Sequence, residues 1–362
     1  MPTIQKITLR RLMLPLIRPY RLSYRTFEAF EPFFVEIEDS DGNTAFADAH
    51  ISPGSSSETR EGGWSFLDRH MRDAIGKTPD AAIATTLGEF EHSKVAATAL
   101  VTALEHLMDD PLLQVPQTIK LPLLTPINET EPAKIEREIE AWLAQGFRTF
   151  KIKVGKDVEA DLARVQCIQA ASSDRATLRL DANRAFTRDD GIRFAAALNP
   201  AGIELFEQPC DADDWDANAA VAKASTVPLM LDEPICTLED IERAGTMSGV
   251  GYCKLKLKRF GGLSRLKEGL DAVRSNGMEP VLGDGLGSEV HAWMEACVAQ
   301  GAIRNAGEFN GFIKAKERVL ENPLPFADGA IELVAGYRPR LDREKLARMT
   351  AEKIEYTQKG RN

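Results

Sequence analysis

Acidic residues and lysines recur along the middle of the chain, each at the end of a short run of strand-forming residues. In chain order, with steps of 24 to 28 residues, they are Lys153, Asp181, Glu207, Asp232, Lys256, Asp284 and Glu308. Carboxylates gathered in a site of low dielectric repel one another unless a cation neutralises them. Oxygen ligands suit Mg²⁺, which keeps positions open for waters or substrate oxygens. The pattern therefore predicts a magnesium site made by Asp181, Glu207 and Asp232.

Each of these carboxylates also has a plainer interpretation. An acidic residue often precedes a helix, where it caps the first turn, and it also pairs readily with a lysine. For any single one of the carboxylates we favour that interpretation. Three of them in register favour the metal.

Lysines occupy places where a buried strand would be apolar. The stretch "YCKLKLKRFGG", residues 252 to 262, alternates lysine and leucine, which indicates a strand with one charged face. Strands of parallel sheets are usually continuous apolar runs, so lysines inside one need partners, and the carboxylates supply them. A divalent cation and a second ammonium would lower the pKa of such a lysine toward the range of a base. The plainer alternative for each is a solvated surface lysine.

The step of 24 to 28 residues between these charged residues corresponds to one strand, one helix and two short loops, the βα unit of a parallel sheet. The strands are predicted in "RTFKIKVG", "ATLRLDAN", "GIELFEQP", "VPLMLDEP", "VGYCKLKL", "EPVLGDG" and "RNAGEFNG". A further unit starts in "IKLPLLTPIN", where Pro122 and Pro126 make the poorest match. We therefore predict an α/β fold, a (β/α)7-8 TIM-like barrel whose strand ends carry the site. A doubly wound sheet is the alternative, but no G-x-G-x-x-G stands at a strand-to-helix turn.

The chain before and after the barrel lacks this repeat of strand and helix. We predict an α+β capping domain with lid loops in residues 1–118, the barrel with the catalytic site in residues 119–325, and a segment that returns to the capping domain in residues 326–362. The loop "ISPGSSSETREGG" is long enough for a lid, and its composition fits disordered filler equally well.

Composition limits the classes of partner. A formal net charge of −10 over 362 residues argues against nucleic acid, because that binding depends on basic patches. Five cysteines without a C-x-x-C pair fit a reducing compartment. No apolar run is long enough for a signal-peptide core or a membrane span. We expect a cytoplasmic protein with a small-molecule partner and no membrane contact.

The phrases "KIKVG", "LDAN", "FEQP", "LDEP" and "KLKRFGG" together resemble the enolase superfamily, in its muconate-lactonizing branch, the mandelate racemase/muconate lactonizing enzyme family. That superfamily is known to use a Lys or His base with Mg²⁺, so the resemblance, and not the spacing, supplies this chemistry. It implies Mg²⁺ on Asp181, Glu207 and Asp232, and Lys153 and Lys256 as acid and base on opposite faces of the carbon next to a substrate carboxylate. It also implies a homo-oligomer.

The resemblance implies further contacts to the substrate. Lys151 would lie near its carboxylate, Asn183 would orient the network, and Asp284 and Glu308 would contact its distal part. The segment "RPYRLSYR" covers the site in relatives, which makes Tyr20, Arg21 and Tyr24 candidates for substrate binding. A basic surface turn is their plainer interpretation.

Two bases facing one carbon permit racemisation or epimerisation, and we prefer an amino acid or amino-acid derivative as substrate. The reason is Glu308, whose charge would meet a substrate ammonium, although it could equally cap a helix or pair with a neighbouring cation. The same lysine pair serves a dehydratase, an o-succinylbenzoate-synthase-like lyase or a cycloisomerase. A barrel that binds a carboxylate without turnover is disfavoured, because a binding module needs no facing lysines.

The chain departs from the family at three places. The phrase "AFADAH" stands where relatives usually have Trp-Gly-Glu, and the usual Leu-Gly-Gly before the first barrel strand is missing from "DDPLLQVPQTIKLPLL". Lys254 stands where relatives tend to carry a small polar residue. We expect Lys254 to point into the barrel one layer deeper than Lys256 and to pair with a carboxylate such as Asp232. His291 is expected inside a helix, with a structural role.

Overall fold

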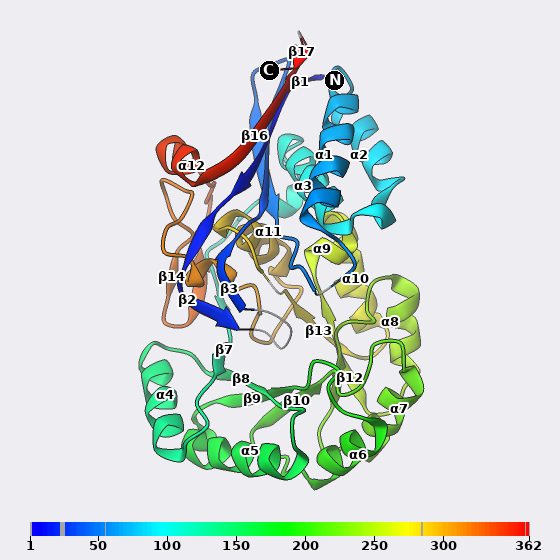
Figure 1. Cartoon of the computed structure of the whole chain (residues 1–362), viewed down its shortest axis with the longest axis vertical. Coiled ribbons are helices and arrows are strands. Elements are labelled where there is room, and N and C mark those ends of the chain that lie inside the picture. Colours follow the sequence, from blue (N-terminus) through cyan, green and yellow to red (C-terminus); the bar gives the residue numbers. More distant parts are fainter. Residues whose placement is uncertain (1, 22–25, 55, 284, 359, 362) are drawn as a thin grey trace.

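A computed structural model describes residues 2–21, 26–54, 56–283, 285–358 and 360–361 of the chain. Figure 1 shows an elongated molecule, with a sheet and its helices at one end and a curved sheet ringed by helices at the other. The two chain termini lie side by side at the end away from the ring. Within the described residues, no helix has the length and apolar character needed to cross a membrane.

The curved sheet is parallel and has the strand order β13-β12-β11-β10-β9-β8-β7. Its strands are β7 (Thr125–Ile127), β8 (Thr149–Lys153), β9 (Thr177–Asp181), β10 (Ile203–Glu207), β11 (Leu229–Leu231), β12 (Val250–Leu255) and β13 (Glu279–Leu282). Neighbouring strands in space are also neighbours in sequence, as a barrel built from βα units requires. The predicted fold class is confirmed.

A helix follows each strand and packs outside the sheet (Figure 1). These helices are α4 (Pro132–Ala144), α5 (Val158–Ser172), α6 (Arg188–Ala197), α7 (Trp215–Ala224), α8 (Leu238–Gly245), α10 (Leu263–Ser275) and α11 (Glu289–Ala299), with the short α9 (Leu257–Phe260) after β12. Thr237 and Asp240 form a capping box at the start of α8. The turn η3 (Ser173–Arg175) ends α5.

The predicted eighth strand in "RNAGEFNG" is not a regular strand, although its backbone closes the barrel. Glu308 N donates to Leu282 O at 2.9 Å, and Gly307 N donates to Pro122 O at 2.9 Å. Gly307 also forms an isolated parallel bridge with Leu123. The segment is therefore held on both sides, by β13 and by the chain before β7.

The first predicted strand is split in two. β6 (Ile119–Pro122) pairs antiparallel with β15 (Ala330–Leu333), which in turn pairs with β14 (Phe326–Ala327). Only β7 joins the parallel sheet. Pro122 and Pro126 lack N–H groups, so one continuous ladder through this segment is not available.

The other sheet has five strands in the order β17-β16-β1-β4-β5. They are β1 (Ile4–Leu12), β4 (Phe33–Asp39), β5 (Thr44–Ala49), β16 (Thr350–Thr357) and β17 (Gly360–Arg361). β4 and β5 form a hairpin around the turn at Asp41 and Gly42, where the φ of Gly42 is +82°. β16, from the chain's last segment, pairs antiparallel with β1. The limits predicted for the three parts of the chain stay predictions.

Helices cover one side of this sheet (Figure 1). They are α1 (Arg60–Ala74), α2 (Pro79–Leu87) and α3 (Lys94–Leu107), with the turns η1 (Phe90–His92) and η2 (Pro111–Leu113). α12 (Arg343–Met349) precedes β16. The hairpin of β2 (Leu14–Arg21) and β3 (Thr26–Phe30) lies between the five-stranded sheet and the barrel, and β2 approaches η4 (Gly311–Lys314).

Candidate active site

A cavity of about 430 Å³ lies between the carboxyl ends of the barrel strands and β2. Among the residues predicted from the sequence, its lining includes Tyr20, Lys151, Lys153, Asp181, Asn183, Glu207, Asp232, Lys256 and Glu308. Tyr24 and Asp284 lie outside the described residues, as does the side chain of Arg21. The structure thus brings the predicted metal ligands and both predicted bases to one cavity.

The predicted metal ligands lie side by side on neighbouring strands. Asp181 ends β9 and Glu207 ends β10, and the two residues are paired in the parallel register. Asp232 follows β11, and its backbone N–H donates to Gln208 Oε1 at 2.9 Å. None of the three side chains is more than slightly exposed. Carboxylates buried this deeply need cationic partners.

Lys151 supplies one such partner. Its Nζ lies 2.9 Å from Asp181 Oδ2, 2.6 Å from Glu207 Oε2 and 2.9 Å from Glu308 Oε2. The residue sits in β8 with its side chain directed into the barrel, two positions before Lys153. One ammonium therefore links two of the predicted ligands to the closing segment of the barrel.

Lys153 lies at one end of the carboxylate row. Its Nζ is 2.5 Å from Asp181 Oδ2 and also donates to Asn183 Oδ1. Asn183 has a positive φ of 44°, a conformation that asparagine tolerates better than most residues, and its N–H donates to Asp181 Oδ1 at 2.9 Å. Asn183 therefore contacts both Lys153 and Asp181, and its role in orienting them stays a prediction.

Lys256 lies at the other end of the row. It follows β12, and its Nζ is 2.9 Å from the carboxylate of Asp232. Arg259, one helical turn later, places Nη1 3.0 Å from Asp232 Oδ1 and donates also to the Asp232 carbonyl. Sequence reasoning missed Arg259, although it stands inside the quoted motif "KLKRFGG".

These contacts set the protonation of the carboxylates. Burial alone would raise the pKa of Asp181 and of Asp232, but the neighbouring lysines outweigh burial and hold both pKa values below the usual range. For Glu207, burial and the adjacent Asp181 outweigh the lysines and raise the pKa to about 7. Glu207 is therefore the carboxylate whose charge is least well compensated by the protein.

The pKa values of Lys151 and Lys254 move away from the range expected for a base. Burial lowers the pKa of Lys151 and of Lys254, but the surrounding carboxylates outweigh burial and raise both. Both side chains are therefore held as ammonium ions. They act here as counter-ions to the carboxylate row, and neither is suited to take a proton.

The donor set fits a hard divalent cation. Asp181, Glu207 and Asp232 offer buried carboxylate oxygens at adjacent strand ends, the ligand chemistry that Mg²⁺ prefers. In the described residues no three such side chains converge closely enough to hold an ion as they stand. Lys151 and Lys254 each place an ammonium within 4 Å of two of the three carboxylates.

Glu308, predicted to meet a substrate ammonium, already has cationic partners inside the protein. It accepts from Lys254 and from Lys151 at 2.9 Å, and Arg179 Nη1 lies 3.5 Å from its Oε1. Burial raises its pKa, but Lys151 and Lys254 outweigh burial and lower the pKa to about 2. These contacts remove the main reason that the sequence offered for an ammonium-bearing substrate.

Tyr20 is the described member of the predicted covering segment. It lines the cavity, and Lys314 Nζ lies 5.1 Å from the centre of its ring. Lys314 also donates to the backbone carbonyl of Asn310 at 3.2 Å. Arg18 and Ser52 line the same cavity. The rim opposite the carboxylate row therefore presents an aromatic ring and two cationic side chains.

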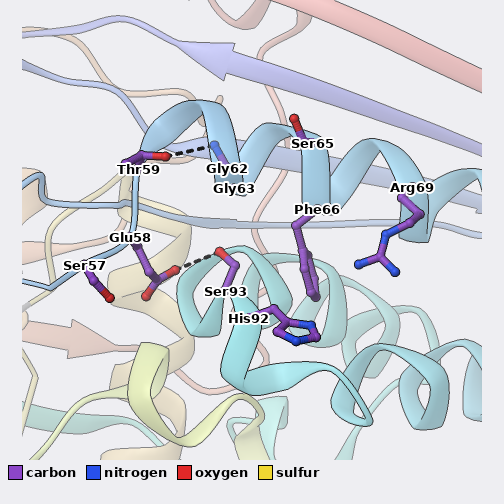
Figure 2. A pocket seen from close by; sticks show the side chains of 10 residues that line it. All are labelled: Ser57, Glu58, Thr59, Gly62, Gly63, Ser65, Phe66, Arg69, His92 and Ser93. Atoms are coloured by element: carbon purple, nitrogen blue, oxygen red, sulfur yellow. Dashed lines mark hydrogen bonds between the residues drawn. The ribbon is translucent and has the colours of Figure 1, made fainter.

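The Ser/Gly-rich loop is anchored at its C-terminal end. A second cavity, of about 350 Å³, lies against this end and is shown in Figure 2. There Glu58 points toward the start of α3, where its Oε2 accepts from Ser93 Oγ at 2.8 Å and from Val95 N at 3.2 Å. Thr59 caps α1 by accepting from Gly62 N at 3.0 Å. The described part of the loop near α1 is therefore ordered by helix caps, while its role as a lid stays a prediction.

His291 is buried within α11 and contacts Asp48 of β5 in the five-stranded sheet. Its backbone N–H donates to Asp48 Oδ1 at 3.0 Å, and its Nδ1 lies 2.8 Å from Asp48 O. Asp48 belongs to the unusual phrase "AFADAH", and it also accepts from Ser288 N at 2.8 Å. The carboxylate thus caps α11 from the other sheet, which supports a structural role for His291.

Comparisons with known proteins agree with this geometry. A family model described as "Enolase C-terminal domain-like" matches residues 134–337, more than half of the chain. The L-Ala-D/L-Glu epimerase of Bacillus subtilis (strain 168) is 27% identical over 77% of this chain and 80% of its own length. The o-succinylbenzoate synthase of Geobacillus kaustophilus is 28% identical over 76% of this chain and 76% of its own length.

Solved structures share the fold. The crystal structure of a dipeptide epimerase from Cytophaga hutchinsonii, complexed with Mg and the dipeptide D-Ala-L-Val, has a TM-score of 0.88 to this chain. The match covers 98% of this chain and 99% of that chain at 21% sequence identity. At this identity the likeness supports the fold alone.

Proposed function

The chain belongs to the mandelate racemase/muconate lactonizing enzyme family of the enolase superfamily, and we propose that it racemises or epimerises an amino acid or amino-acid derivative. One observation carries the proposal. Lys153 and Lys256 end strands on opposite sides of the barrel and flank one row of buried carboxylates. A substrate carboxylate held at this row would present its α-carbon to an amine on each face.

The proposed reaction moves one proton at a time. The neutral amine of one lysine takes the α-proton, and the electron pair of the broken C–H bond passes into the carboxylate, which gives an enolate. The ammonium of the other lysine then returns a proton to the opposite face of the carbon. The product has inverted configuration, and each lysine has exchanged its protonation state.

We assign Asp181, Glu207 and Asp232 as the residues that would hold Mg²⁺. The cation, when bound, supplies positive charge to the substrate carboxylate as negative charge develops there. Lys151, held as an ammonium by its carboxylate partners, adds a second positive charge at the same place. Asn183 fixes the Lys153 amine, and Arg259 fixes the Asp232 carboxylate.

The names of the relatives support the substrate class. A relative over most of the chain is an L-Ala-D/L-Glu epimerase, an isomerase of a dipeptide. We therefore place amino-acid derivatives with a free carboxylate, dipeptides included, first among the compounds to test. The cytoplasmic location and the homo-oligomeric state stay predictions.

A lyase or cycloisomerase that uses the same lysine pair is the second candidate. The contacts of Glu308 with Lys254 and Lys151 favour this candidate. A carboxylate that is already paired inside the protein gives no sign that the substrate carries an ammonium group. A relative of similar identity is an o-succinylbenzoate synthase. The two candidates share the proton abstraction and differ in the fate of the enolate.

Isotope exchange separates these possibilities. The purified protein would be incubated with Mg²⁺ in D₂O against amino acids, N-acyl amino acids, dipeptides and hydroxy acids, with a Lys153→Ala/Lys256→Ala protein as control. We expect deuterium at an α-carbon, detected by mass spectrometry and lost both in the control and in EDTA. Chiral analysis of the labelled compound then tests inversion.

Each other outcome has a definite meaning. Dehydrated products in place of exchange would favour the lyase. Exchange that persists in the double lysine variant would exclude Lys153 and Lys256 as the bases. No exchange with any compound, in a protein that binds Mg²⁺, would contradict the amino-acid proposal for the classes tested.

A further inference from the structure

Lys254 is a buried lysine that the proposed reaction does not use. It lies in β12, two residues before Lys256, so both side chains point to the inside of the barrel. Its Nζ donates to Glu308 and lies 3.1 Å from Glu207 Oε1 and 3.8 Å from Asp232 Oδ2. The expected pairing with Asp232 is therefore present, and the nearer partners are Glu308 and Glu207.

Glu308 is held on its far side by further protein groups. Arg179, which is fully buried, lies 3.5 Å from Glu308 Oε1 and is itself fixed by Glu204 at 2.8 Å and by Asn305 at 3.2 Å. This chain of contacts keeps Glu308, and through it the Lys254 ammonium, beneath the carboxylate row. The same Lys254 ammonium contacts both Glu308 and Glu207.

A contribution to stability alone does not account for the buried ion pair of Lys254 and Glu308. Replacing a buried ion pair by apolar side chains of similar volume is often neutral or stabilising, because desolvating two charges is costly. Apolar residues do pack close by, where Leu205, Met230 and Val281 form a cluster and Val281 is paired with Lys254 in the register of β12 and β13. The ion pair of Lys254 and Glu308 contacts the predicted metal ligand Glu207, and we therefore ask what it does to metal binding.

We propose that Lys254 is a positioning residue that weakens and tunes divalent-cation binding, its ammonium being held by Glu308 against the metal-ligating face of Glu207. This inference rests on the magnesium site of the proposed function. The ammonium competes with the cation for Glu207 Oε1 and repels it at a distance of a few ångströms, where low dielectric makes the repulsion large. Glu308 opposes that effect by neutralising the ammonium.

The two members of the pair therefore have opposite predicted effects on Mg²⁺ affinity. Lys254→Met removes the competing positive charge, so Mg²⁺ should bind about tenfold or more tightly. Glu308→Gln removes the neutralising charge and leaves the ammonium to Glu207 and Asp232, so Mg²⁺ should bind about tenfold or more weakly. Lys254→Met/Glu308→Gln removes both charges, and its affinity should return to within about threefold of the wild-type value.

The test is isothermal titration of Mg²⁺ into these proteins at pH 8, without substrate, after circular dichroism has shown that each is folded. Lys223→Met, which removes a lysine from the exposed end of α7, is the matched control and should leave the affinity unchanged. Opposite shifts in the two single variants, with reversal in the double variant, would support the inference. A purely structural role would not give that reversal.

The other outcomes overturn one claim or the other. Weaker or unchanged binding in Lys254→Met, or parallel losses in both single variants, would overturn the role of Lys254. If Lys254→Met does not fold, Glu308→Gln carries the test, and an unchanged affinity there overturns it equally. A wild-type protein that binds no Mg²⁺ would instead overturn the metal site of the proposed function.

Discussion

Lys153 and Lys256 approach one row of carboxylates from its two ends. Lys153 Nζ lies 2.5 Å from Asp181, and Lys256 Nζ lies 2.9 Å from Asp232, while Glu207 stands between the two acids in the strand order. The lysines come from β8 and from the end of β12, on opposite sides of the curved sheet. Two amines arranged in this way can reach opposite faces of one bound carbon.

The first prediction concerns the single lysine variants. Lys153→Ala and Lys256→Ala should each lose racemisation or epimerisation by about 10²- to 10⁴-fold, the range for loss of a general acid or base. Each should still exchange the α-proton of one configuration, because the remaining lysine serves only its own face. Exchange in D₂O would be measured separately from each pure stereoisomer.

The control and the contrary result are both specific. Lys267→Ala removes a half-buried lysine on the outer side of α10, paired with Asp271, and should leave exchange from both stereoisomers intact. If either catalytic variant exchanged both stereoisomers at reduced but equal rates, the two lysines would not act on separate faces.

The second prediction concerns the metal. Mg²⁺ that binds the folded state alone should raise the unfolding temperature, with a stabilisation of about 2.7 kcal/mol at a hundred times Kd. Asp232→Asn, which removes one predicted ligand charge, should lose most of this rise in a thermal-shift titration. Asp73→Asn, on the exposed side of α1, should keep it. An equal rise in all three proteins would show that the ion binds elsewhere.

Most of the barrel could be predicted from the sequence because each predicted strand ends in a charged residue, and these residues recur at a regular spacing. The prediction failed where proline interrupts a strand and where backbone hydrogen bonds close the barrel without a regular strand. Pro122 and Pro126 split the first predicted strand. Glu308 lies in a segment that backbone hydrogen bonds join to Leu282 on one side and to Pro122 on the other. A sequence pattern records side chains, and closure of the ring depends on backbone pairing between distant segments.

The site was predictable to a similar degree. The residues at strand ends reached one cavity, because parallel strands bring their carboxyl ends together. The partners of Glu308 were not predictable, since a carboxylate at a strand end has the same sequence signature whether it meets a substrate or Lys254. Arg259 and Arg179 were missed because the sequence does not show which carboxylate each guanidinium meets, Asp232 for Arg259 and Glu204 and Glu308 for Arg179.

The third prediction is a pH dependence of stability that comes from Glu105. This residue of α3 is buried, and it accepts from Leu263 N, at the start of α10, at 2.9 Å. Burial, as the main cause, raises its pKa from 4.5 to about 7. A carboxyl with a raised folded-state pKa stabilises the fold at low pH and loses that contribution as pH rises from about 4.5 to 7, at most about 3 kcal/mol.

Glu105→Gln keeps an acceptor for Leu263 N and removes the titration. Its unfolding free energy in urea should match the wild-type value at pH 5 within about 1 kcal/mol. At pH 8 the variant should be the more stable protein. If wild type and variant show the same slope of stability between pH 5 and 8, the titrating group lies elsewhere.

The last prediction concerns Asp48, which joins β5 of the five-stranded sheet to helix α11 of the barrel. Its buried carboxylate accepts from Ser288 N at 2.8 Å, Ser288 Oγ at 2.6 Å and His291 N at 3.0 Å, so it caps the first turn of α11 from another part of the chain. Asp48→Ala leaves these buried donors without their acceptor and should lower the unfolding free energy by about 2–4 kcal/mol, measured in urea. Asp80→Asn, on the exposed face of α2, should change it by less than about 0.5 kcal/mol. If Asp48→Ala lowers the unfolding free energy no more than the control does, water replaces the cap. The five-stranded sheet would then be held to α11 by apolar packing alone.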